Sequence, residues 1–185
     1  MAKLIWSPSE KRKQEANITK YISYINERYC QTIKSAEDLH TWSIEQIPDF
    51  WASIWDFTGI KASRGYDEVV DNLGNFPGAK WFQGARLNFA ENLLKYRDNH
   101  LAFIFKGETQ ISSVMTYAEL YDAVARLAKS LRGIGLKPGD RVAAYMPNLP
   151  ETAIAMLAAT SIGAVWASCA ISTAWKCKDG SSPIK

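Results

Sequence analysis

Apolar residues recur at helical spacing near the start of the chain, with polar residues between them. They follow one another at steps of four, three and four residues, which is typical of one face of an amphipathic helix: Ile18, Ile22, Ile25 and Tyr29. The preceding Ser7-Pro8-Ser9-Glu10 predicts a helix start, with Ser7 as the N-cap, proline at the first helical position and glutamate at the third. The pattern therefore predicts a helical N-terminal segment.

Aromatic residues gather after Pro48 at a short helical spacing that Gly59 ends. They are Phe50, Trp51, Trp55 and Phe57, with Ile54 among them. We interpret them as packing anchors that attach this segment to a larger body, because a platform for stacking nucleic-acid bases needs basic neighbours that this stretch lacks. Residues 60–100 show many turn formers and little periodicity, which predicts an irregular connector with a short helix from Phe89 to Tyr96.

The pattern changes at residue 101 to strands followed by a long helix. Leu101–Phe105 and Ile111–Met115 are strand-like runs joined through residues 106–109, which predicts a β-hairpin. Thr116-Tyr117-Ala118-Glu119 is a capping box, in which hydroxyl and carboxylate groups satisfy free amides at a helix start. The helix predicted there ends at Gly133 and Gly135, and its apolar stripe consists of Leu120, Val124, Leu127, Leu131 and Ile134.

The last elements predict a parallel β-α-β unit. Residues 141–146 form a strand, Pro150 lies near the first position of a helix that Gly163 ends, and residues 164–169 resume as a strand. Two strands joined through a helix pair in parallel with a right-handed crossover. Because a parallel sheet needs cover on both faces and more strands than two, we expect the chain to be cut off inside its own domain.

Composition limits the class of protein. The 185 residues are 47% hydrophobic and 22% charged, with a net charge of +3. This composition supports a packed core and excludes a disordered chain, a collagen and a polybasic nucleic-acid-binding tail. Thr152–Trp175 carries no charge, but it is rich in small residues and divided by Gly163, so we interpret it as a buried helix and a buried strand rather than a membrane span.

Few residues offer catalytic or metal-binding chemistry. The three cysteines form no CxxC pair and the two histidines lie far apart, which predicts a reduced, cytosolic chain without a zinc site. Phosphate loops, nucleophile elbows and HExxH helices do not occur, and Gly133-Ile134-Gly135 lacks the third glycine of a dinucleotide fingerprint. We interpret His40, His100 and Cys169 as packing residues and Asp179–Lys185 as a frayed polar terminus rather than a phosphate cradle. No catalytic, cofactor-binding or metal-binding residue is assigned.

Three stretches together resemble the adenylate-forming acyl-CoA synthetases, and among them the acetoacetyl-CoA synthetases. They are Lys80–Leu94, with the sequence KWFQGARLNFAENLL, Gly139–Asn148, with the sequence GDRVAAYMPN, and Ile162–Trp166, with the sequence IGAVW. The first stretch is the specific one, and the resemblance extends to about residue 169. In the matched segments we interpret Trp81 and Phe82 as buried anchors and Asn88 as a cap for the following helix.

The resemblance implies a reaction, its cofactors and a location. Members of the family activate a carboxylic acid with ATP and Mg²⁺ to an acyl-adenylate and transfer the acyl group to coenzyme A. For this chain the acid would be acetoacetate, in the cytosol, in lipid metabolism and ketone body utilisation, with neither nucleic acid nor membrane as a partner. The family's phosphate loop, adenine-binding motifs and C-terminal lysine have no counterpart here, and the sequence diverges at Ala170–Cys177.

These observations predict an α/β chain in three segments. Residues 1–60 form a helical, Trp-rich cap, residues 61–169 form the incomplete start of an AMP-binding domain with a β-hairpin and the first β-α-β unit, and residues 170–185 form a divergent polar tail. We expect the N-terminal portion of an acetoacetate–CoA ligase, inactive alone and without cofactors of its own. The alternative is a truncated non-catalytic isoform that associates with a partner such as the full-length enzyme, through the open edge of its sheet.

Overall fold

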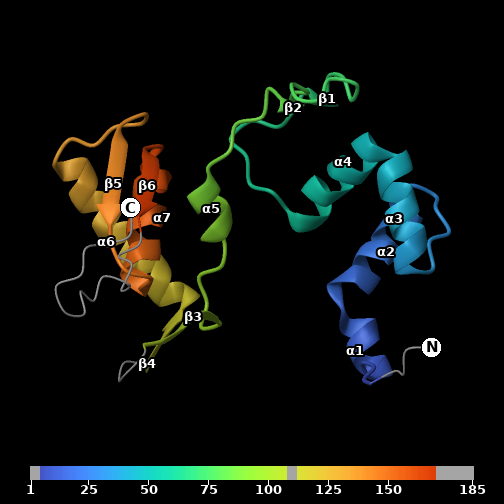
Figure 1. The fold of residues 1–185 in the computed structure, drawn as a ribbon, viewed down its shortest axis with the longest axis horizontal. Helices are drawn as coiled ribbons and strands as arrows, with labels where there is room; N and C mark the ends of the chain where they lie inside the picture. Colours follow the sequence, from blue (N-terminus) through green and yellow to red (C-terminus); the bar gives the residue numbers. More distant parts are fainter. Residues whose placement is uncertain (1–4, 108–111, 170–185) are drawn as a thin grey trace, which may run out of the picture. The chain divides into compact units, whose positions relative to one another are not determined.

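The computed structural model describes residues 5–107 and 112–169 (Figure 1). The chain divides into two compact units, Met1–Arg86, here called unit 1, and Leu87–Lys185, here called unit 2. In its described part, unit 1 is mainly helical with one small antiparallel sheet, and unit 2 combines helices with an antiparallel hairpin and a parallel strand pair. The predicted segment boundaries after residues 60 and 169 stay predictions.

Unit 1 begins with four helices, α1 (Glu10–Glu15), α2 (Asn17–Arg28), α3 (Ala36–Glu45) and α4 (Ile47–Thr58). The predicted start at Ser7 is wrong, because Ser9 is the N-cap and its hydroxyl accepts a hydrogen bond from the Arg12 amide at 3.3 Å. Extended backbone at Ala16 separates α1 from α2, where the sequence pattern predicted continuous helix. The helical class of the segment is confirmed and its boundaries are corrected.

The core of unit 1 is built from α2, α3 and the loop between them. Its buried residues are Tyr21, Ile25, Ile33 and Trp42. Ile25 is fully buried as predicted, whereas Ile18 is 49% exposed, so the buried face of α2 is centred one residue away from the predicted stripe, toward Tyr21. A tyrosine in a mixed sequence does not stand out as a core residue. Its ring is buried against Phe50 and Phe57 of α4, with centroids 6.5 and 4.9 Å away, and its hydroxyl is hydrogen-bonded to Ser53 of the same helix.

The predicted aromatic helix is α4, and Gly59 ends it in the left-handed conformation as expected. Trp55, Tyr66 and Phe82 pack together in one cluster, since the ring centroids of Tyr66 and Phe82 lie 5.2 and 5.0 Å from that of Trp55 and 5.3 Å from each other. Strands β1 (Glu68–Val70) and β2 (Trp81–Gln83) pair antiparallel within the segment predicted to be irregular. Trp81 is 41% exposed, so its interpretation as a buried anchor is wrong. Neighbouring residues of a strand point to opposite faces, and Phe82 rather than Trp81 packs on Trp55.

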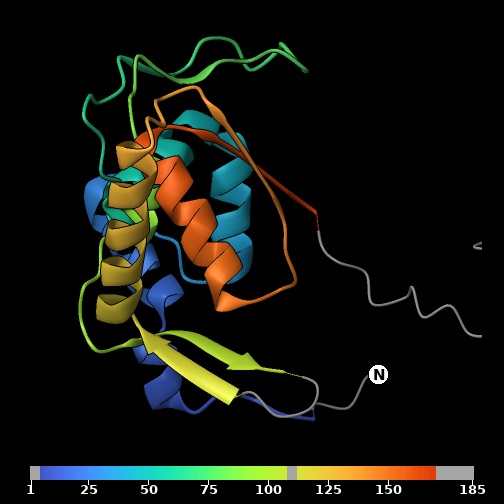
Figure 2. The same cartoon turned by 90° about the vertical axis from the view of Figure 1, so that its left-hand side faces the viewer.

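Unit 2 opens with α5 (Phe89–Leu93) and the predicted hairpin. Asn88 is the N-cap of α5, as expected, and its side chain accepts a hydrogen bond from the Glu91 amide. Strands β3 (Leu101–Lys106) and β4 (Ser112–Thr116) pair antiparallel, with Ile104 opposite Val114. Figure 2 shows this hairpin crossing the N-terminal end of α6 (Tyr117–Gly133). Residues 108–111 of the predicted connection lie outside the described residues.

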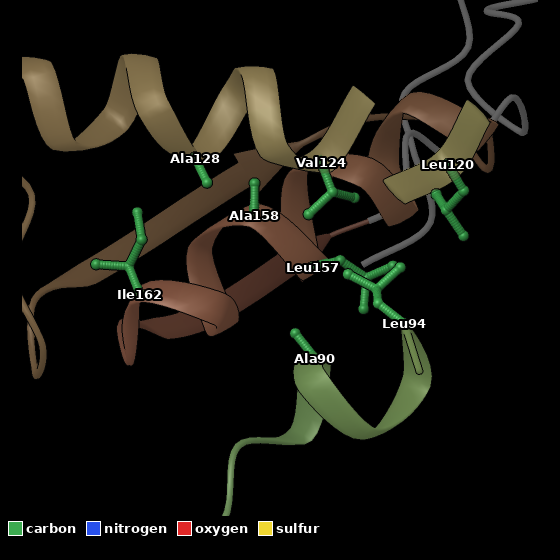
Figure 3. Close-up of a cluster of buried hydrophobic side chains, with 8 residues drawn as sticks. All are labelled: Ala90, Leu94, Leu120, Val124, Ala128, Leu157, Ala158 and Ile162. Atoms are coloured by element: carbon green, nitrogen blue, oxygen red, sulfur yellow. The ribbon is translucent and has the colours of Figure 1, made fainter. Parts of the chain in front are cut away.

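Helix α6 begins with the predicted capping box. The Glu119 amide donates to the Thr116 hydroxyl at 3.2 Å, and the Thr116 amide donates to the Glu119 carboxylate at 2.8 Å. Its inner face packs on α7 (Pro150–Ile162), and α5 contributes from below (Figure 3). The buried cluster contains Ala90, Leu94, Leu120, Val124, Ala128, Leu157, Ala158 and Ile162. The assignment of Ile134 to the buried stripe of this helix is wrong, because Ile134 lies beyond the helix end and is 81% exposed.

The predicted β-α-β unit is confirmed. Strands β5 (Arg141–Tyr145) and β6 (Val165–Cys169) pair in parallel around α7, with Arg141 opposite Val165 and Tyr145 opposite Cys169. The predicted strand at residues 164–169 is present, but the prediction that it is buried is wrong, because Val165 is 55% exposed. Within the described residues, one face of this strand pair is exposed, at Arg141, Ala143 and Tyr145 of β5 and at Val165 and Ala167 of β6. Among the described helices, none is long and apolar enough to span a bilayer.

Candidate functional site

The parallel strands β5 and β6 define the candidate site, because ligands of open parallel sheets bind outside the carboxyl ends of the strands. Both strands reach this edge together: Tyr145 lies opposite Cys169, and the Met146 amide donates to the Cys169 carbonyl at 3.2 Å. Residues 146–149 then lead from β5 into α7. The chain after Cys169 lies outside the described residues, so the described part of the edge is the β5–α7 connection.

A cavity of about 180 Å³ opens beside this connection. It is lined by Phe103, Ile104 and Phe105 of β3 and by Asn148, Leu149, Pro150 and Ala153. The connection is held locally, since the Thr152 hydroxyl donates to the Pro147 carbonyl at 2.7 Å and the Thr152 amide donates to the Leu149 carbonyl at 3.1 Å. The lining is apolar apart from the Asn148 side chain. This cavity fits a small apolar group and offers no acid or base for proton transfer.

A wider and more open cavity of about 480 Å³ lies in unit 1 at the end of α2 and along α3. Its lining residues are Gln31, Thr32, Ile33, Lys34, Asp38, Thr41, Trp42 and Glu45. Hydrogen bonds from the backbone of Lys34 and from Ser35 hold the pKa of Asp38 below its usual value. Asp38 is the carboxylate of the α3 capping box. Its oxygens serve the helix start, so this carboxylate is a structural group and not a general base.

The interpretation of His40, His100 and Cys169 as packing residues is wrong. All three are exposed, because they lie on the solvent side of α3, in the loop before β3 and at the end of β6. His100 Nδ1 lies 3.0 Å from Asp98 Oδ1, and this hydrogen bond lowers the pKa of Asp98. These isolated groups form no catalytic constellation, and within residues 5–107 and 112–169 no group of three or more potential metal ligands occurs. Asp179–Lys185 lie outside the described residues.

One structural contact near this site joins segments distant in the sequence. The Asn88 side-chain amide donates to the Thr160 carbonyl at 2.9 Å, while its oxygen caps α5. Asn88 was predicted only as a cap, and the second bond has no signal in the sequence because Thr160 is seventy-two positions away. This contact fixes α5 against the C-terminal turn of α7, next to the Gly163 turn that leads into β6.

Comparisons with known proteins match this architecture. The family pattern described as AMP-binding enzyme matches residues 89–172, and the one described as acetyl-coenzyme A synthetase N-terminus matches residues 36–93. The acetoacetyl-CoA synthetase of Xenopus tropicalis is 42% identical over 169 residues, which are 89% of this chain and 25% of that protein. The malonamoyl-CoA synthetase of Penicillium aethiopicum is 39% identical over 153 residues, 79% of this chain and 21% of that protein.

The fold matches a solved structure as well. The acetoacetyl-CoA synthetase from Streptomyces lividans superimposes with a TM-score of 0.80 at 35% identity, over 91% of this chain and 27% of that chain. The predicted α/β fold class is therefore confirmed. The class of protein that these elements match is therefore the AMP-binding enzymes, over residues 89–172, preceded by a segment that matches the acetyl-coenzyme A synthetase N-terminus.

Within that class the chain is homologous to the N-terminal part of the acetoacetyl-CoA synthetases. It spans about a quarter of the length of the curated relatives that it matches. The family resemblance read from the KWFQGARLNFAENLL, GDRVAAYMPN and IGAVW stretches is confirmed.

Proposed function

We propose that these residues form the N-terminal part of an ATP-dependent acetoacetate–CoA ligase, which converts acetoacetate, ATP and coenzyme A to acetoacetyl-CoA, AMP and pyrophosphate. The observation that carries the proposal is the superposition on the Streptomyces lividans acetoacetyl-CoA synthetase, which covers 91% of this chain at 35% identity. The similarity to the acetoacetyl-CoA synthetases of Xenopus tropicalis and Rhizobium meliloti, at 42% and 38% identity, supports it.

The role proposed for this part is a scaffold. A carboxylate is a poor electrophile, and its activation requires a closed site from which water is excluded. The described cavities are open or apolar, and the described residues include neither a glycine-rich phosphate loop nor a cluster of metal ligands. No described residue therefore fits ATP, Mg²⁺ or coenzyme A, and we derive no step through them. The 185 residues alone are proposed to be inactive.

Acetoacetate is proposed as the acid because most of the similar proteins reported above are named acetoacetyl-CoA synthetases. A relative named for malonamoyl-CoA synthesis matches this chain almost as closely as the acetoacetyl-CoA synthetases do. The matched quarter is thus shared by enzymes that are named for different acids. We infer that the residues that select the acid lie mainly in the other three quarters of such enzymes.

A chimera tests the reaction. Residues 1–169 of this chain replace the corresponding segment of the Xenopus tropicalis enzyme, and acetoacetate-dependent exchange between ATP and pyrophosphate is measured beside the 185-residue protein. We expect exchange by the chimera and none by the 185-residue protein. Exchange by the latter alone would refute the proposed inactivity. A folded chimera without acetoacetate-dependent exchange would refute the proposal that this segment serves in an acetoacetate–CoA ligase.

A second candidate is a non-catalytic isoform that binds the full-length enzyme, and its support is the uncovered face of β5 and β6. Tyr145 is 69% exposed and Val165 is 55% exposed, although parallel sheets are normally covered on both faces. Tagged 185-residue protein should then recover full-length synthetase from cells that express both, and its failure to do so would remove this candidate.

The cytosol is the proposed compartment. Cys30 and Cys169 are free and exposed thiols, a state that persists in a reducing compartment. Cell fractionation followed by thiol labelling of the intact protein tests this assignment, and recovery in an oxidising compartment with blocked thiols would contradict it.

A further inference from the structure

We draw no further inference here: the strongest candidate, the apolar cavity of about 180 Å³ between strand β3 and the β5–α7 connection, belongs to the candidate site already described, and nothing in residues 5–107 and 112–169 shows what fills or covers it.

Discussion

The amide of Asn88 and the carbonyl of Thr160 are joined by a hydrogen bond of 2.9 Å that connects the start of α5 to the last turn of α7. The same side chain caps α5 through its oxygen, at 3.1 Å from the Glu91 amide. One asparagine therefore uses both its donor and its acceptor at two helix ends: it caps the Glu91 amide, and it adds a second hydrogen bond to the Thr160 carbonyl, which also accepts one from the Gly163 amide at 3.0 Å.

Substitution of Asn88 should separate these two roles. Asn88→Ala removes both bonds and is expected to lower the free energy of unfolding by about 1–3 kcal/mol, since loss of a cap alone costs about 1 kcal/mol. Asn88→Asp keeps the cap and loses the donor to Thr160, so it should fall between the wild type and alanine. Urea unfolding measures both. An alanine variant as stable as the wild type would show that neither bond contributes.

The buried hydroxyl pair of unit 1, Tyr21 and Ser53, predicts which of two variants is the less stable. Tyr21 Oη lies 2.6 Å from Ser53 Oγ, and Ser53 also donates to the Phe50 carbonyl at 2.7 Å, so the tyrosine must supply the proton of the shared bond. Ser53→Ala leaves the Tyr21 hydroxyl buried without its acceptor and should cost about 1–3 kcal/mol. Tyr21→Phe leaves Ser53 bound to Phe50 and should cost less. A double-mutant cycle measures the coupling, and the reverse order would contradict this assignment.

The same tyrosine should make unit 1 sensitive to alkali. Burial raises the pKa of Tyr21 above its ordinary value of 10.0. Because the folded pKa exceeds the unfolded pKa, the corresponding stability is present below about pH 10 and is lost as the pH rises beyond it. Burial also raises the pKa values of Tyr29 and Tyr66, so absorbance of phenolate during alkaline titration should show late ionisation that Tyr21→Phe reduces without abolishing it. A titration identical in wild type and variant would exclude Tyr21 as its source.

The capping carboxylates predict the response to acid. Hydrogen bonds from the backbone and hydroxyl of Thr116 lower the pKa of Glu119, and those from Lys34 and Ser35 lower the pKa of Asp38. Their stabilisation is present above the unfolded values near 4 and is lost as the pH falls through the folded values. Urea unfolding between neutral and acid pH should show a smaller decline for Glu119→Gln, which keeps the capping geometry without titrating. Glu15→Gln, outside any capping box, serves as the control and should decline as the wild type does.

Gly163 should resist substitution. Gly163 lies in the turn before β6 with a φ of 90°, and a β-carbon added there would lie 3.3 Å from the side chain of Pro138, in the turn before β5. Gly163→Ala is therefore expected to destabilise unit 2 by about 1 kcal/mol or more, through backbone strain and contact with Pro138. Gly133→Ala is the matched control, because nothing lies within 4 Å of the added carbon and alanine favours the last turn of α6. Thermal unfolding should shift in opposite directions for the two variants, and equal shifts would contradict this explanation.

Local signals in the sequence determined most of unit 2. The capping box at Thr116, proline at the start of α7, Gly163 at its end and the alternation of apolar runs depend on interactions within a few residues. Such short-range rules predicted the hairpin, the long helix and the parallel pair correctly. They also brought out the stretches through which the family resemblance was recognised.

Tertiary structure decided which residues are buried and which distant groups meet. Tyr21 is buried because α4 brings Ser53 to it, and Asn88 reaches Thr160 because α5 packs against α7. Trp81 and Ile134 are exposed although their residue types favour burial, because strand alternation and the Schellman turn at the end of α6 direct them outward. Burial and long-range hydrogen bonds depend on neighbours that only the folded chain brings close. Helix caps and apolar periodicity, by contrast, depend on residues that are near one another in the sequence. The sequence therefore determined the helices and strands and the family resemblance. Only the packed structure decided which residues form the core, the hydrogen bond between α5 and α7, and the exposure of Ile134.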